Sequence, residues 1–260
     1  MFRIFLRLYI IIACMILMLP IVVVVIVSFS GDDYLTFPPS TWSMRWFVLF
    51  FSDPSWQRAL LVSFGAGVAS AIIATIVGFL TAYAFLRSEV RSKKLMLTLV
   101  LSPIIIPHII TAIAMYYTAM SINAVGSFTL VAFCHSVMAL PVVVLILLSS
   151  LQSVEPSLEK AAIGMGCNQI QLFRRVVMPI AWPGVVSAAL FAFLTSFDEL
   201  LIALFLGGAD FKTLPVRIWQ SLEMELEPTI AAVSSFLITI TALILLTDWA
   251  LKFRRASINL

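Results

Sequence analysis

The chain has 260 residues, of which 62% are hydrophobic and 11% are charged, and its mean hydropathy is +1.11. Soluble domains are about 45–50% apolar and about 25% charged, so this composition excludes a cytosolic enzyme, a disulfide-rich secreted scaffold and a disordered chain. The net charge of +3 is too small to indicate a nucleic-acid partner, and three scattered cysteines predict neither a disulfide framework nor a metal site. We therefore expect a single all-α domain over residues 1–260 whose main solvent is membrane lipid.

Apolar runs recur along the chain and predict a polytopic membrane protein with six transmembrane helices. A helix that spans a bilayer needs about 20 apolar residues. The first run is longer than the apolar core of a signal peptide and no small-residue cleavage site follows it, so it predicts an uncleaved span. The six expected spans cover about 8–28, 60–86, 95–120, 128–149, 184–206 and 229–251.

The distribution of basic residues orients these spans. With the N-terminus in the cytoplasm, 12 of the 16 Lys and Arg residues fall in inner segments and four fall in outer segments. Inner loops of membrane proteins are enriched in Lys and Arg. The sequence therefore predicts that both termini are cytoplasmic.

Two features near the first two spans leave alternatives open. The outer stretch 30–57 carries Phe37-Pro38-Pro39 and Trp46, which are typical of an interfacial anchor, although Trp46 is also a candidate for the substrate pathway. Small residues recur at four-residue spacing in the second span and form a face that allows close helix contact. This face, which runs from Ser63 to Gly78, predicts contact either with a helix of the same chain or with a second membrane subunit.

The inner loop 150–183 has the pattern of two short helices joined at a glycine. Pro156 suits the first turn of a helix, and Gly166 suits its C-terminal cap. Asn168 and Gln171 then have the spacing of a capping box that begins a second helix. The first helix carries an apolar stripe, which needs either the chain's own span ends or a cytoplasmic protein as its partner. The stripe consists of Leu158, Ala161, Ala162 and Met165.

This loop resembles the EAA loop of bacterial ABC-importer permeases. The family pattern is Glu-Ala-Ala, three residues, Gly, nine residues, Ile, one residue and Leu-Pro. Here Lys160 departs from the usual Glu, although Glu159 precedes it, and Val176 and Met178 replace Ile and Leu conservatively. The resemblance implies a type I ABC importer permease fold with a cytoplasmic coupling helix that docks on an ATPase. The residues at the matching or adjoining coupling positions are Glu159, Lys160, Ala161, Ala162, Gly166 and Pro179.

Within that family the chain is most similar to the second permease subunit of spermidine/putrescine-type importers. The residues that carry this similarity are Phe37-Pro38-Pro39 with Trp46, Ser102-Pro103, Ser196-Phe197-Asp198-Glu199 and Thr213-Leu214-Pro215. The resemblance implies a bacterial inner-membrane permease that forms half of the pathway for a small cation such as a polyamine. It also implies a second homologous permease, two ATPase subunits and a periplasmic substrate-binding protein as partners.

The chain lacks the Gly-x-x-x-x-Gly-Lys-Ser/Thr loop that binds nucleotide phosphates. We therefore expect a non-catalytic subunit without a cofactor of its own, and ATP and Mg²⁺ bound by the partner ATPase.

Two adjacent acids, Asp198 and Glu199, lie in the outer half of the fifth expected span. Carboxylates facing lipid are costly, and acids inside a membrane face a cavity or a partner. We expect at least one of them to line the substrate pathway, together with Ser196 and Trp46, and the alternative is a structural pair at the interface with the other permease. Pro103 and Pro107 are expected to kink the third span. His108, which follows them, is expected to be a satisfied interior group.

Two other functions compete with that of an ABC permease. An ion-gradient-driven secondary transporter often shows inverted internal repeats, and we find none in this sequence. A membrane scaffold without transport is the second alternative. Neither explains the spacing of the EAA-like loop.

The orientation can be tested with fusions to a reporter enzyme that is active only in the periplasm. Fusions after Asp53 or Asp210 should be active and fusions after Lys93 or Arg174 inactive, because the basic residues favour cytoplasmic inner loops. The opposite pattern at any two of these positions would overturn the six-span map.

Overall fold

The computed structural model describes the backbone of residues 2–88, 92–208, 211–224 and 227–258. The side chains of residues 2, 224 and 244–258 lie outside the description, as do residues 209 and 210 and the side chains of the last third of the sixth expected span. The described residues form helices and, apart from one isolated bridge between Ser30 and Trp42, no strand pairing. The all-α prediction is confirmed for them.

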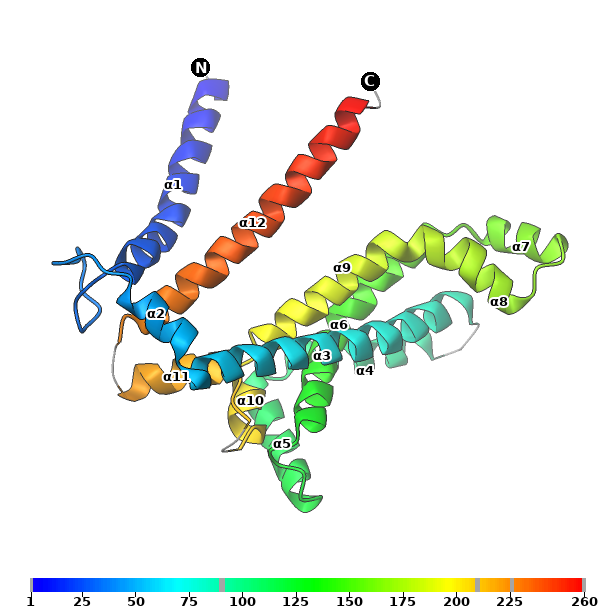
Figure 1. The fold of residues 1–260 in the computed structure, drawn as a ribbon. Coiled ribbons are helices and arrows are strands. Elements are labelled where there is room, and N and C mark those ends of the chain that lie inside the picture. The colour runs from blue at the N-terminus through cyan, green and yellow to red at the C-terminus, as the bar shows by residue number, and fades with distance from the viewer. Residues whose placement is uncertain (1, 89–91, 209–210, 225–226, 259–260) are drawn as a thin grey trace. The chain divides into compact units, whose positions relative to one another are not determined.

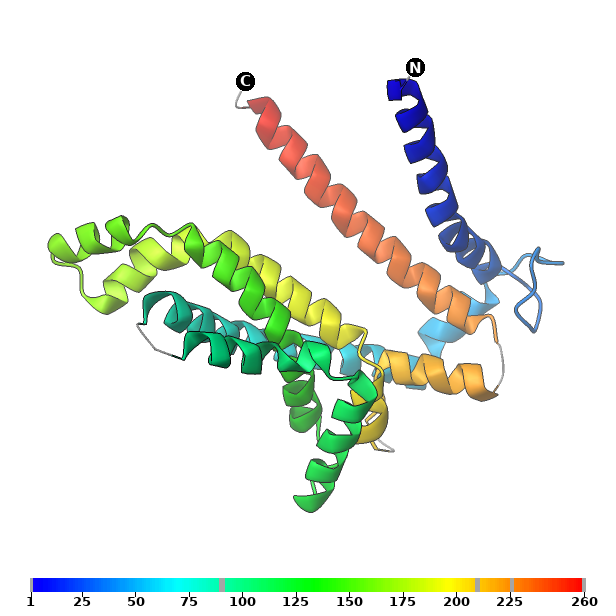
Figure 2. The same ribbon diagram turned by 180° about the vertical axis from the view of Figure 1, so that it is seen from behind.

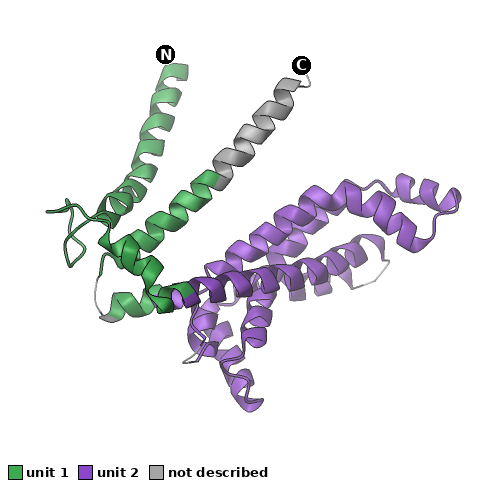
Figure 3. Cartoon of the chain, in the orientation of Figure 1, with its two compact units in different colours: residues 1–57, 218–260 green, residues 58–217 purple. Residues whose placement is uncertain are grey.

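The helices follow one another in the order shown in Figure 1. They are α1 (Phe2–Ser28), α2 (Arg45–Ser52), α3 (Pro54–Arg87), α4 (Lys93–Ile105), α5 (His108–Ser121), α6 (Phe128–Gln152), α7 (Pro156–Gly164), α8 (Gln169–Leu172), the π-helical turn η1 (Phe173–Val177), α9 (Met178–Phe197), α10 (Leu201–Leu206), α11 (Leu214–Met224) and α12 (Thr229–Ile258). The chain divides into two compact units, residues 1–57 with 218–260 and residues 58–217 (Figure 3).

Four described helices are long and apolar enough to cross a membrane, and they are α1, α3, α6 and the continuous helix Gln169–Phe197. The bent pair α4 and α5 makes a fifth if it counts as one span. The described apolar part of α12, Thr229–Leu243, is shorter. A helix thus occupies each of the six expected positions, and the complete six-span map remains a prediction.

Two of the expected spans are interrupted. The third bends by 101° between α4 and α5, where Pro107 stands immediately before the new helix. Proline lacks the N–H that continues a helix and its ring clashes with the preceding turn, so the expected kink is confirmed but is far sharper than a bend in one helix. The fifth span is not the single helix predicted over 184–206, because α9 ends at Phe197 and α10 begins at Leu201.

Close packing of α6 against α9 forms the centre of the second unit, where the two helices run side by side (Figures 1 and 2). A Cβ atom on Gly184 of α9 would lie 2.1 Å from the Ser150 hydroxyl of α6. That hydroxyl donates a hydrogen bond to the Ala181 carbonyl of α9 at 3.2 Å. The absence of a side chain at residue 184 is therefore what allows the two helices to approach so closely.

The small-residue face of α3 packs against the same pair of helices. A Cβ atom on Gly67 would lie 2.8 Å from the Phe193 ring of α9, and one on Gly78 would lie 2.6 Å from Val143 of α6. Of the two alternatives left open by the sequence, contact within the chain is therefore the one found at these two glycines.

In the first unit, α2 packs against α12 through aromatic side chains. The rings of Phe50 and Phe51 lie with their centroids 5.4 and 5.2 Å from that of Phe236. Helices α2 and α11 are not among the elements expected from the sequence. Both helices have eleven or fewer residues and are too short to stand out as spans.

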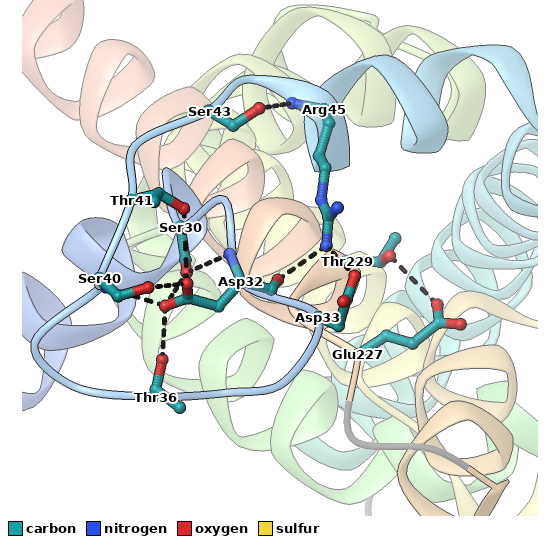
Figure 4. A network of polar contacts seen from close by, with 10 residues as sticks. All are labelled: Ser30, Asp32, Asp33, Thr36, Ser40, Thr41, Ser43, Arg45, Glu227 and Thr229. Carbon is teal, nitrogen blue, oxygen red and sulfur yellow. Dashed lines mark hydrogen bonds and ion pairs between the residues drawn. The ribbon is translucent and has the colours of Figure 1, made fainter.

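The loop between α1 and α2 is organised around one carboxylate, that of Asp32 (Figure 4). It accepts hydrogen bonds from the hydroxyls of Ser30 at 3.1 Å, Thr36 at 2.7 Å and Thr41 at 3.4 Å. Ser40 donates to it through its backbone N–H at 2.9 Å and through its hydroxyl. Because these donors, above all Ser40, stabilise the ionised form, the pKa of Asp32 is held well below its ordinary value.

Replacing Asp32 with Ala should loosen this loop, because it removes the common acceptor of four side chains. Limited proteolysis of the purified protein should then cut within residues 30–44 several times faster, whereas Asp33→Ala, which removes a single partner of Arg45, should have a smaller effect. Because the pKa of Asp32 is lower in the folded loop than in the unfolded chain, its ionised carboxylate stabilises the folded loop. This stabilisation is fully present above the unfolded pKa of about 3.9 and is lost as the pH falls toward and through the folded pKa. Cleavage of the wild type should therefore be unchanged between pH 8 and pH 5, and faster cutting at pH 5 would contradict this role of Asp32.

Candidate functional site

The two acids of the fifth expected span lie in the gap between α9 and α10. Asp198 caps the end of α9 by donating its backbone N–H to the Leu194 carbonyl at 3.1 Å, and its side chain is exposed. Glu199 is only 8% exposed, and its Oε1 accepts the backbone N–H groups of Leu201 and Ile202 at 3.1 and 3.2 Å. The adjacent carboxylates thus have different environments, because that of Glu199 accepts the first N–H groups of α10, whereas that of Asp198 has no hydrogen-bond donor among the residues that the structure describes.

His108, the first residue of α5, faces the second oxygen of Glu199. Its Nδ1 lies 3.7 Å from Glu199 Oε2, and its side chain is 54% exposed. Helices α5 and α10 pack against each other here, with the rings of Tyr116 and Phe205 6.2 Å apart. The expectation of an interior position differs from the structure of this chain, because the 101° bend places His108 at an exposed helix start, although Glu199 gives its ring a polar partner.

A second polar pair includes Ser196, which lies two residues before Asp198 in the sequence. The Ser196 hydroxyl of α9 is 2.8 Å from Nδ1 of His135 in α6, and both side chains are buried. Ser196, expected to line the pathway, is therefore engaged in an interior hydrogen bond. Sequence reasoning missed His135, which sits within the apolar run of α6 and is connected to Ser196 only by the tertiary packing of α6 against α9.

Trp46, the remaining expected pathway residue, belongs to the first unit. It is buried in α2, and the guanidinium carbon of Arg45 lies 4.3 Å from the centre of its ring. In such a cation–π contact the guanidinium is attracted to the face of the aromatic ring. The site formed around Asp198 is consequently built from residues of the second unit.

Among the residues that the structure describes, no group of three His, Cys, Asp or Glu side chains lies close enough to hold a metal ion.

The inner loop forms a helical hairpin, which we call the coupling tip and which consists of α7, α8 and η1 (residues 156–177). Helix α7 ends in a Schellman motif, in which Gly166 N–H bonds the Ile163 carbonyl at 2.9 Å and Cys167 N–H bonds the Ala162 carbonyl at 3.1 Å. Gly166 has a φ of +89°, as this motif requires. Its predicted role as a helix cap is confirmed.

Helix α8 begins with the predicted capping box. The Asn168 side chain accepts the Gln171 backbone N–H at 2.8 Å, and the Gln171 side chain accepts that of Asn168 at 3.1 Å. No break follows α8, since η1 continues into α9 and the helix is continuous from Gln169 to Phe197. The helix that carries the fifth expected span therefore begins well before residue 184, and Pro179 sits inside this continuous helix.

An ion pair holds the coupling tip to α3. Arg87, in the last turn of α3, donates from Nε to Glu159 Oε1 at 2.8 Å, and its Nη2 donates to the same oxygen and to the Val154 carbonyl at 2.9 Å. Glu159 is buried although α7 lies at the end of the unit. Arg87 entered the sequence-based orientation only as one of the basic inner residues, and its position at the end of a span was the available signal.

The apolar stripe predicted on α7 is divided between two surfaces. Ala162, which is buried, packs with Glu159 toward the chain's own core, whereas Leu158, Ala161 and Met165 are exposed. Lys160 is exposed as well. One side of α7 is thus covered by the chain's own core, and the other side remains available to a cytoplasmic protein.

Comparison with known proteins places this arrangement in a family. Residues 74–255 match the family described as binding-protein-dependent transport system inner membrane component. The chain belongs to this family. It is therefore an inner-membrane permease subunit of an ABC importer, and the ion-gradient-driven alternative no longer applies.

Related permeases cover most of the chain. The spermidine/putrescine transport system permease protein PotC of Haemophilus influenzae is 28% identical over 234 residues, which cover 89% of this chain and 90% of that protein. The putrescine transport system permease protein PotI of Escherichia coli is 25% identical, with 90% and 86% covered. The sulfoquinovosyl glycerol transport system permease protein SmoH of Agrobacterium fabrum is 30% identical, with 76% and 72% covered.

Solved structures share the permease fold. A bacterial ABC transporter that imports the acidic polysaccharide alginate matches with a TM-score of 0.63 at 16% identity, over 96% of both chains. An amino acid ABC transporter with histidines matches with a TM-score of 0.55 at 20% identity, over 79% of this chain and 94% of the other. At these identities the comparison establishes the fold alone.

Breaking the ion pair of the coupling tip should destabilise the permease. Arg87→Ala or Glu159→Ala should lower the free energy of unfolding by about 1.5–3 kcal/mol, the usual value of a hydrogen bond to a charged group. The double variant should lose clearly less than the sum of the two single losses, because the remaining charge is no longer left unpaired. Denaturation of the purified variants measures these values.

Lys160→Ala provides the matched control, since it removes an exposed neighbouring charge and should change the free energy of unfolding little. Strict additivity of the Arg87 and Glu159 losses would show that the pair contributes no coupling.

Proposed function

We propose that the permease forms half of the translocation pathway for a small organic cation of the polyamine class. The observation that carries the proposal is the exposed carboxylate of Asp198, at a helix break inside an apolar span. Two of the relatives named above are spermidine/putrescine and putrescine permeases. Since other relatives carry names of different solutes, the charge of the site is the stronger support for a cationic substrate.

A cation that enters the membrane loses part of its hydration. An exposed carboxylate offsets this loss through charge-assisted hydrogen bonds to the ammonium groups. Among the described residues nothing donates a hydrogen bond to the Asp198 carboxylate, so it is available to the substrate. Glu199 already accepts two backbone N–H groups and faces His108. In this proposal Asp198 contacts the substrate, and Glu199 positions Asp198 by fixing the start of α10.

The proposal includes three kinds of partner. A second, homologous permease would complete the pathway and cover an apolar groove between α3 and α9. This groove has a volume of about 600 Å³ and includes Phe64, Val68, Ile72, Val186, Leu190 and Phe193 in its lining. Two ATPase subunits, which bind ATP and Mg²⁺, would dock on the coupling tips, and a periplasmic binding protein would deliver the substrate.

Uptake of labelled polyamine into cells or proteoliposomes, normalised to the assembled complex, tests the pathway. Asp198→Asn should reduce uptake at least tenfold with assembly intact, because it removes the charge and keeps the shape. Glu223→Gln, at an exposed acid in α11, is the matched control and should leave uptake unchanged. Wild-type uptake by Asp198→Asn would refute the pathway role, and loss of assembly would instead favour a structural contact with the second permease.

Two glycines of the coupling tip provide a test of ATPase docking. Gly166→Ala should reduce recovery of the ATPase with tagged permease severalfold, because a left-handed backbone costs an L-residue about 1–2 kcal/mol and the tip is distorted. Gly164→Ala is the control, since a Cβ atom there meets open space on a helical backbone. Equal recovery with both variants would contradict docking through a tip of this shape.

A further inference from the structure

The outer surface of the coupling tip is both apolar and exposed. Four large apolar side chains of α7, α8 and the turn between them are exposed, and Met165 is 80% exposed. They are Leu158, Ile163, Met165 and Ile170. The same segment buries Ala162 and Leu172 in the core of the unit, so its inner side is well packed. Exposed apolar clusters of this kind mark a contact surface.

The charge exposed on this surface is mainly positive. Lys160, Arg174 and Arg175 are exposed, and within the described part of the chain Lys160 has no ion-pair partner. The acid next to it, Glu159, points inward and is engaged by Arg87. Glu155, at the start of α7, is the other acid of the segment. The chain thus neutralises Glu159 internally and presents Lys160 outward.

Lys160 shares a side of α7 with Ile163, which lies three residues further along the helix. A partner that covers the apolar side chain also removes water from the ammonium group. Burying an unpaired charge is strongly unfavourable, so a surface that fits Ile163 must also supply an anion for Lys160. Charge-assisted hydrogen bonds from an ammonium group to a carboxylate satisfy this requirement.

We propose that Lys160 docks against a carboxylate of the partner ATPase, at the edge of an apolar cleft that receives Ile163. The inference rests on the proposed docking of the tip on an ATPase and adds the sign of the charge that the ATPase presents. It reverses the polarity that a Glu at this position of the EAA pattern would require. Lys160 is therefore a specificity-determining residue that selects an ATPase with a complementary acid.

The helix that carries the tip is longer than the hydrocarbon core of a bilayer. The continuous helix Gln169–Phe197 has 29 residues and is roughly 43 Å long, compared with about 30 Å for the hydrocarbon core of a bilayer. Its first turns, which include Arg174 and Arg175, therefore extend beyond the hydrocarbon core, and the cross-linking test below distinguishes a protein carboxylate from a lipid headgroup.

Co-purification of the transport system's own ATPase with the tagged permease in detergent is the first test. Lys160→Glu should reduce ATPase recovery at least tenfold, and Lys160→Gln, which removes the charge without reversing it, should reduce it severalfold. Lys94→Glu is the matched control at an exposed Lys of α4 and should leave recovery unchanged. Failure of the wild type to retain the ATPase would overturn the proposed function itself, whereas normal recovery with Lys160→Glu would overturn this inference and leave docking intact.

Cross-linking with a carbodiimide then identifies the acid. The reagent activates a carboxylate, which the Lys160 amine attacks to form an amide with net loss of water, so only groups in contact are joined. Mass spectrometry should find Lys160 joined to an Asp or Glu of the ATPase, the product should be absent from Lys160→Gln, and replacing that acid with Lys should restore recovery of the Lys160→Glu permease. Dependence of recovery on added anionic phospholipid, with no such cross-link, would show that Lys160 binds a lipid headgroup and would overturn the proposal.

Discussion

A chain surrounded by lipid must satisfy its backbone hydrogen bonds internally, because the hydrocarbon core offers no water to replace them. This constraint explains why the described residues are almost entirely helical, and it also explains what happens where helices stop. At the start of α10, the N–H groups of Leu201 and Ile202, which have no partner within the helix, bond to the carboxylate of Glu199. At the start of α5, Pro107 reduces by one the number of N–H groups that need a partner. Helix ends inside the predicted spans therefore coincide with the polar residues on which the proposed function depends.

The sequence was sufficient to predict features that depend on local order. The helix start at Pro156, the cap at Gly166 and the capping box of Asn168 and Gln171 involve residues no more than a few positions apart. Helices are also found at all six apolar runs, because hydrophobicity over about 20 residues is itself the physical cause of membrane insertion. These features could be read correctly without knowing which helices touch.

Features that depend on tertiary contacts could not be predicted. Arg87 and Glu159 are 72 positions apart, and His135 and Ser196 are 61 apart, so nothing in the local pattern links them. The difference between Asp198 and Glu199 arises from a helix break that the apolar run 184–206 does not reveal. The position of His108 follows from the size of the bend, and the prolines indicated a bend without giving its angle.

The continuity of α8, η1 and α9 has a mechanical consequence. One uninterrupted helix has the coupling tip at one end and Asp198 directly after the other. A helix of roughly 43 Å that moves as one body and tilts by about 5° about one end displaces the other end by about 4 Å. A small rotation imposed on the tip would thus move the carboxylate by more than the length of a hydrogen bond, with no relay of intervening side chains.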